Sequence, residues 1–67
     1  MIQIKLNGKQ YKLRSGSSLE SLLKANDLQS DQVGVELNYK IINQKHFKET
    51  IIRNNDDIEI VEFVGGG

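Results

Sequence analysis

Hydrophobic and polar residues alternate at the start of the chain, with apolar side chains at every second position of residues 2–6. Alternation with period two and β-branched residues predicts a half-buried strand. Asn7-Gly8 follows directly, and this pair favours a two-residue hairpin turn because both residues accept positive φ. Tyr11 and Leu13 then alternate with polar neighbours. The pattern therefore predicts a β-hairpin over residues 2–14.

The spacing of apolar residues changes from two to three and four after residue 18. Leucines at positions 19, 22 and 23 form one apolar stripe, as expected for a helix that packs on a core. Ser17 and Glu20 have the spacing of a capping box, in which each side chain bonds to a backbone amide of the first turn. We predict a helix from about Ser18 to Asn26, with Leu28 tucked under its end.

Alternation returns in the second half of the chain. Residues 33–38 predict a third strand, and Asn38-Tyr39-Lys40 predicts a turn that leads to a brief edge strand at Ile41-Ile42. Residues 43–50 are polar around Phe47, which is typical of a loop or one helical turn with a single anchor in the core. Ile51-Ile52 is expected to rejoin the core.

The last predicted strand covers residues 58–64 and follows a turn at residues 54–57, where asparagine tolerates the left-handed region. Ile58 and Ile60 point to one side of this strand. Val61 and Phe63 point to the other side, away from the predicted core. Loops or a sheet edge would explain apolar residues there, and so would a docking patch for another protein.

The element order is strand, strand, helix and then two or three further strands. We predict an α+β fold in which one main helix covers one face of a mixed sheet of four to five strands. Right-handed crossovers place the first and last strands side by side and parallel at the centre. This arrangement is the ubiquitin-like β-grasp. We expect one domain over residues 1–64, followed by a flexible glycine tail at residues 65–67.

Composition excludes several kinds of site. The 67 residues include no cysteine and one histidine, His46, so we expect no disulfide, no thiolate metal site and no other metal centre. Nine basic and nine acidic residues cancel, which argues against nucleic-acid binding. No apolar run approaches the length of a membrane span, and no leader pattern opens the sequence. These features predict a cytoplasmic protein.

Three of the six glycines occupy the last three positions, Gly65, Gly66 and Gly67. Glycine has no Cβ, so such a segment can pass through a narrow channel with backbone angles that other residues avoid. This suits a terminal carboxylate that is carried into another protein's active site. A glycine-rich chain end without purpose is the alternative interpretation.

A known family shares this combination of features. The residues that carry the resemblance are the hairpin Ile2–Leu13, Leu22-Leu23, Val35–Asn38 with Lys40–Ile42, Asn55–Ile60 and the terminal Val64–Gly67. With these features the chain resembles the sulfur carrier proteins of thiamine biosynthesis, the ThiS family, over essentially its whole length. The terminal glycines at this chain length are the most specific part of the resemblance.

The resemblance implies a protein co-substrate rather than an enzyme. It implies that an E1-like adenylyltransferase uses ATP to adenylate the carboxylate of Gly67. A persulfide sulfur from a cysteine desulfurase system then replaces AMP and leaves a thiocarboxylate, which thiazole synthase consumes. Residues Gly65–Gly67 enter the partner channels, and Val61 and Phe63 form the candidate docking patch. The chain itself is expected to bind no cofactor.

Three other functions fit the same residues. A sulfur carrier for molybdopterin synthesis uses the same terminal chemistry, although such chains tend to be longer. A protein modifier would be joined to lysines through Gly67. A plain β-grasp interaction domain would make no use of its tail.

Overall fold

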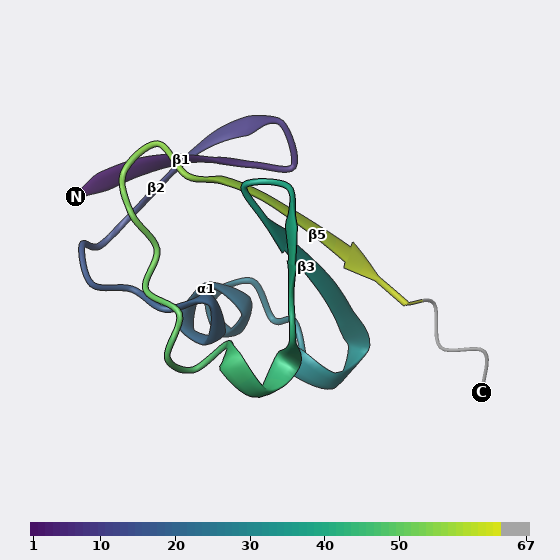
Figure 1. Ribbon diagram of the computed structural model, residues 1–67. Coiled ribbons are helices and arrows are strands. Elements are labelled where there is room, and N and C mark those ends of the chain that lie inside the picture. Colours follow the sequence, from purple (N-terminus) through teal and green to yellow (C-terminus); the bar gives the residue numbers. More distant parts are fainter. Residues whose placement is uncertain (64–67) are drawn as a thin grey trace.

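The computed structural model describes residues 1–63, in which one five-stranded sheet packs against one α-helix (Figure 1). The elements are β1 (Ile2–Leu6), β2 (Lys9–Leu13), α1 (Leu19–Ala25), the 3-10 helix η1 (Ser30–Gln32), β3 (Val33–Leu37), β4 (Lys40–Ile42), the 3-10 helix η2 (Gln44–His46) and β5 (Asp57–Glu62). Val64 and the predicted flexible tail at residues 65–67 lie outside the described residues.

The strands follow the order β2-β1-β5-β3-β4 across the sheet. β1 and β5 are parallel neighbours at the centre, whereas β1–β2, β3–β4 and β3–β5 are antiparallel pairs. The predicted mixed sheet with first and last strands in parallel is confirmed. The parallel pair places β5, the strand nearest the chain's end, between two others, so its backbone is hydrogen-bonded on both sides.

A tight turn connects the two strands of each hairpin, β1–β2 and β3–β4. In the first, Asn7 and Gly8 have φ values of 50° and 82°, as a type I′ turn requires. In the second, Asn38 and Tyr39 have φ values of 51° and 69°. The Asn38 side chain accepts a hydrogen bond from the backbone N–H of Asp57 at 2.9 Å. This bond supports a left-handed conformation that a tyrosine seldom adopts.

The predicted cap of α1 was wrong by one residue. Ser18 is the N-cap. The Ser18 hydroxyl accepts a hydrogen bond from the backbone N–H of Ser21 at 3.1 Å, and the backbone N–H of Ser18 donates to Oγ of Ser21 at 2.9 Å. The Ser17 hydroxyl instead donates to the carbonyl of Arg14 at 2.7 Å and closes the turn after β2. The Glu20 carboxylate lies 3.7 Å from the ammonium of Lys24.

The C-terminal end of α1 lies where the sequence predicted it, with Asn26 as the C-cap. Asp27 takes φ 57°, its N–H donates to the carbonyl of Lys24, and the N–H of Leu28 donates to that of Leu23 at 2.9 Å. These two bonds make a Schellman motif, in which one left-handed residue terminates the helix. Leu28 is partly buried against the core, as predicted.

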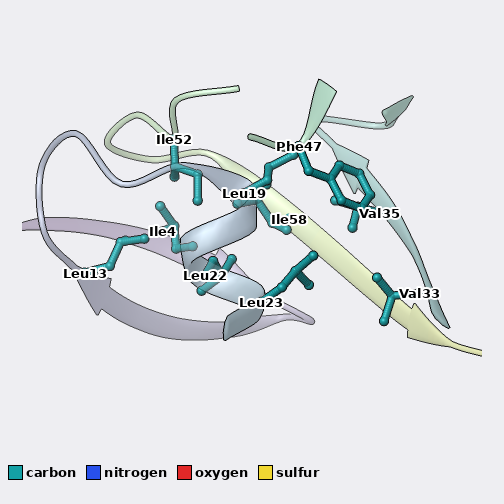
Figure 2. Packing of buried hydrophobic residues seen from close by; sticks show 10 residues of the cluster. All are labelled: Ile4, Leu13, Leu19, Leu22, Leu23, Val33, Val35, Phe47, Ile52 and Ile58. Carbon is teal, nitrogen blue, oxygen red and sulfur yellow. The ribbon is translucent and has the colours of Figure 1, made fainter. Parts of the chain in front are cut away.

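The core lies between α1 and one face of the sheet (Figure 2). Its buried residues are Ile4, Leu13, Leu19, Leu22, Leu23, Val33, Val35, Phe47, Ile52 and Ile58. The leucine stripe and the Phe47 anchor are therefore confirmed. Ile51 is a correction, because it is 45% exposed while Ile52 is buried. Ile51 forms an extended bridge with Ser18, and consecutive extended residues point to opposite sides.

Candidate functional site

Hydrogen bonds to neighbouring segments fix the chain along β5 and up to Phe63, the last residue described. On its β1 side, the N–H of Lys5 donates to the carbonyl of Asp56, and that of Asn7 donates to the carbonyl of Ile58, both at 2.9 Å. The side chain of Asn7 continues this ladder, since its Oδ1 accepts from the N–H of Ile60 at 2.7 Å. The turn of the first hairpin thus fixes the middle of β5.

The β3 side secures the end of β5. Val33 pairs with Glu62, and the N–H of Phe63 donates to the carbonyl of Gln32 at 2.9 Å. The chain is therefore hydrogen-bonded up to Phe63. The predicted carrier residues Gly65, Gly66 and Gly67 follow within four positions but lie outside the described residues, so their predicted use is argued below as a proposal.

Val61 and Phe63 lie on the sheet face opposite α1, where each side chain is 61% exposed. Val61 pairs with Gly34 of β3. The Phe63 ring lies over the same glycine, because a methyl group placed at Gly34 would be 3.4 Å from Cζ of that ring. The orientation predicted from the alternation of β5 is confirmed, whereas the predicted docking use stays a prediction.

Ile41 belongs to the same exposed apolar surface. It is 82% exposed on the edge strand β4, where it pairs with Glu36. A hollow of about 360 Å³ lies among Ile41, Val61 and Phe63 over the β3–β5 pair. We call these three residues the apolar strip. Sequence reasoning missed Ile41, although two adjacent isoleucines in a strand must face opposite sides, and Ile42 packs against the core.

The charged residues of this face are segregated. Strand pairing places Lys5 and Lys12 over β1 and β2, and Glu36 and Glu59 over β3 and β5. Lys5 pairs with Asp57, which lies two residues before Glu59 on β5. The apolar strip thus borders an acidic half of the face rather than a neutral one.

Tyr39 adds a polar feature beside this acidic half. Its hydroxyl donates to Oδ2 of Asp57 at 3.2 Å. This hydrogen bond to Asp57 is the main cause that raises the pKa of Tyr39 above its usual value, and the negative charges of Asp57 and Glu59 add to it. The second hairpin turn therefore presents a neutral phenol next to the carboxylates.

Other residues singled out in the sequence lie elsewhere. Nδ1 of His46 is 2.8 Å from a carboxylate oxygen of the exposed Glu49. Tyr11 is partly buried against the core, and its hydroxyl accepts from the side-chain amide of Asn26 at 3.3 Å. Residues 1–63 contain no group of three or more histidine, cysteine or acidic side chains that could hold a metal ion. No helix in the same range is long and apolar enough to cross a membrane.

Comparison with known proteins adds to this geometry. The model of the ThiS family matches residues 4–67, and so includes the terminal glycines. The sulfur carrier protein ThiS of Bacillus subtilis is 38% identical over 65 residues, which cover 96% of this chain and 98% of that protein. The crystal structure of the thiamine biosynthesis protein ThiS from Geobacter metallireducens superposes with a TM-score of 0.83 and 29% identity, over 98% of this chain and all of the other.

A much longer protein contains a similar segment. The thiazole synthase of Magnetococcus marinus is 32% identical over 66 residues, which are 98% of this chain and only 20% of that protein. The similarity therefore covers one unit of the thiazole synthase and leaves four-fifths of it without a counterpart here.

Proposed function

The chain belongs to the ThiS family, and we propose that it is a sulfur carrier for the formation of thiazole in thiamine biosynthesis. The observation that carries the proposal is the match of the ThiS family model through Gly67. The similarity to the sulfur carrier of Bacillus subtilis over almost the full length of both chains supports the same function. The β-grasp body with a central terminal strand suits a carrier, because that strand leads directly to the tail.

The working group in this proposal is the α-carboxylate of Gly67. A carboxylate is a poor electrophile, because its charge repels nucleophiles and oxide is a bad leaving group. An oxygen of Gly67 attacks the α-phosphorus of ATP, which releases pyrophosphate and makes an acyl adenylate. A persulfide sulfur displaces AMP, and reduction of the acyl disulfide by a thiol leaves the thiocarboxylate. This chain has no cysteine, so the persulfide and the thiol come from partners.

The partners follow from these steps. An E1-like adenylyltransferase uses ATP to catalyse the activation step, a cysteine desulfurase system supplies the persulfide, and thiazole synthase takes the sulfur. The segment similar to this chain within the thiazole synthase of Magnetococcus marinus supports the last partnership. In this scheme the chain acts as a protein co-substrate in the cytoplasm and holds no cofactor of its own.

The tail and the sheet face have different functions in partner recognition. Gly65, Gly66 and Gly67 enter the partner channels, since residues without Cβ atoms pass where larger residues would collide. Val61 and Phe63 serve as the docking patch, which brings the tail to the channel from one side. The hydrogen bond from the N–H of Phe63 to the carbonyl of Gln32 supports this division, because it holds the chain to the sheet four residues before Gly67.

Intact-mass measurement tests the proposal. The chain is incubated with the E1-like adenylyltransferase, ATP and a sulfur donor, and a variant without Gly67 serves as the control. We expect a mass gain equal to the replacement of one oxygen by sulfur in the full chain and none in the control. Adducts on lysines of other proteins would instead identify a protein modifier. Transfer of the sulfur to a molybdopterin acceptor, rather than to thiazole synthase, would identify the other carrier.

A further inference from the structure

Two glutamates face each other across the centre of the acidic half. Glu36 of β3 and Glu59 of β5 are directly paired in the antiparallel ladder. Directly opposed side chains lie on the same side of a sheet with Cβ atoms about 4.5–5.5 Å apart, and like charges in this position are destabilising. Glu36 is half-buried and Glu59 is exposed, so water does not fully screen the first of the two.

No cation compensates this pair within residues 1–63. The salt bridge of that range joins Lys24 to Glu20, and Nδ1 of His46 contacts Glu49. Neither contact involves Glu36 or Glu59. The lysines that strand pairing assigns to the same face, Lys5 and Lys12, belong to β1 and β2. The free protein therefore keeps two neighbouring carboxylates that an external cation would stabilise.

The glutamate pair adjoins the apolar strip. Glu36 and Glu59 line the same hollow of about 360 Å³ as Ile41, Val61 and Phe63. A partner that fills this hollow with an apolar side chain also brings its own flanking residues against both carboxylates. Burial at such a contact would strengthen any charge–charge interaction there, because the local dielectric falls when water is excluded.

We propose that this face binds a protein surface that places an apolar side chain in the hollow and an arginine or lysine between Glu36 and Glu59. This inference rests on the proposed function, since the partner is the adenylyltransferase that must reach Gly67. Arginine suits the position because its planar guanidinium can donate to two carboxylates at once. A second copy of this chain, docked by two-fold symmetry on the same patch, would instead set the glutamate pair against itself.

The test uses the purified E1-like adenylyltransferase and the full chain. Its affinity is measured for the wild type, for Glu36→Gln with Glu59→Gln, and for Glu49→Gln as the control. The control makes the same change on an exposed carboxylate that lies outside the hollow. We expect the double variant to bind at least about tenfold more weakly, with a shallower dependence on salt, and the control to bind like the wild type.

Thermal unfolding separates recognition from a structural function of the two glutamates. Because the double variant removes a like-charge contact, we expect its unfolding midpoint to rise by roughly 1–5 °C. An Ile41→Ala variant, which removes a largely exposed side chain, should also bind more weakly without loss of stability. Weaker binding together with an unchanged or higher unfolding midpoint supports the proposal.

The contrary outcomes are distinct. Binding of the double variant at the wild-type affinity overturns this inference alone, provided that the wild type binds and gains sulfur. A lower unfolding midpoint for the double variant overturns it as well, because the carboxylates would then be structural. Dimerisation of the wild type that Ile41→Ala abolishes assigns the face to a second copy and overturns the inference. If the wild type does not bind the enzyme, both this inference and the proposed function are wrong.

Discussion

The contact between Gly34 and Phe63 shows how one residue shapes the exposed face. Gly34 lies in β3 opposite Val61, and the Phe63 ring covers it. Glycine in a strand interior exposes backbone and leaves a neighbour without a packing partner. An aromatic ring beside the glycine compensates for this, and the Phe63 ring that approaches Gly34 also lines the hollow.

Gly34→Ala should stabilise the protein by about 0.5 kcal/mol, because alanine loses less backbone entropy on folding. Its methyl group would meet the Phe63 ring at 3.4 Å, an ordinary contact distance. Gly16→Ala makes the same change where φ is 87° and nothing lies within 4 Å. It should destabilise by about 1 kcal/mol through backbone strain alone. Urea unfolding measures both changes, and equal destabilisation by the two would contradict the account.

Tyr39 offers a pH-dependent test at the same scale. Its raised pKa, caused first by the hydrogen bond to Asp57, means that the neutral phenol is favoured in the folded state. The associated stability is present below pH 10 or so, the ordinary pKa of tyrosine. It is lost as the pH rises through the higher folded value.

Asp57→Asn should lower the pKa of Tyr39 toward 10.0, since it weakens the hydrogen bond to the phenol and removes the negative charge of Asp57. Absorbance titration of the phenolate measures the change, and Tyr39→Phe assigns the transition to this residue. A titration curve that Asp57→Asn leaves unmoved would show that the hydroxyl does not interact with Asp57 in solution.

At the scale of helices, strands and turns, the sequence predicted an element correctly wherever its local pattern was compatible with only one type of structure. The Asn7-Gly8 turn, the leucine stripe and the alternation of residues 33–37 each specified their element, and all three are confirmed. The helix cap was not predictable in this way, because two adjacent serines compete for the position. Ser17 is used by the turn after β2, which leaves Ser18 as the cap. Only the path of the incoming chain decides between them.

Ser18→Ala should cost about 1 kcal/mol of stability, because the N–H of Ser21 loses its hydrogen-bond acceptor at the start of α1. Amide hydrogen exchange at Ser21 should become faster in this variant. Ser17→Ala is the matched control, and it should leave exchange at Ser21 unchanged. The reverse pattern would restore the cap at Ser17 that the spacing to Glu20 suggested.

At the scale of the whole molecule, the tail was easier to find than the surface that presents it. Gly65–Gly67 is visible in the sequence, and the alternation of β5 predicted that Val61 and Phe63 face away from the core. The proximity of Glu36 to Glu59 was not visible, because it depends on the register between β3 and β5. That register joins segments more than twenty residues apart, and no local pattern specifies it.

The folded body, and not the glycine tail, should therefore determine the stability of the protein. Within residues 1–63, the buried core residues lie between Ile4 and Ile58. Removal of Gly65–Gly67 should change the free energy of unfolding by less than about 0.5 kcal/mol, the usual range for changes away from the core. Urea unfolding of the shortened chain measures this change. A larger loss of stability would mean that the glycines are part of the fold.

The central claim is that the free carboxylate of Gly67 is the group that does the work. The most direct measurement compares thiazole formation, in a mixture of the adenylyltransferase, the sulfur source and thiazole synthase, with two chains. One chain ends in the carboxylate of Gly67 and the other, made by semisynthesis, ends there in a carboxamide. We expect thiazole from the first chain and none from the second. Equal thiazole formation from both would contradict the account.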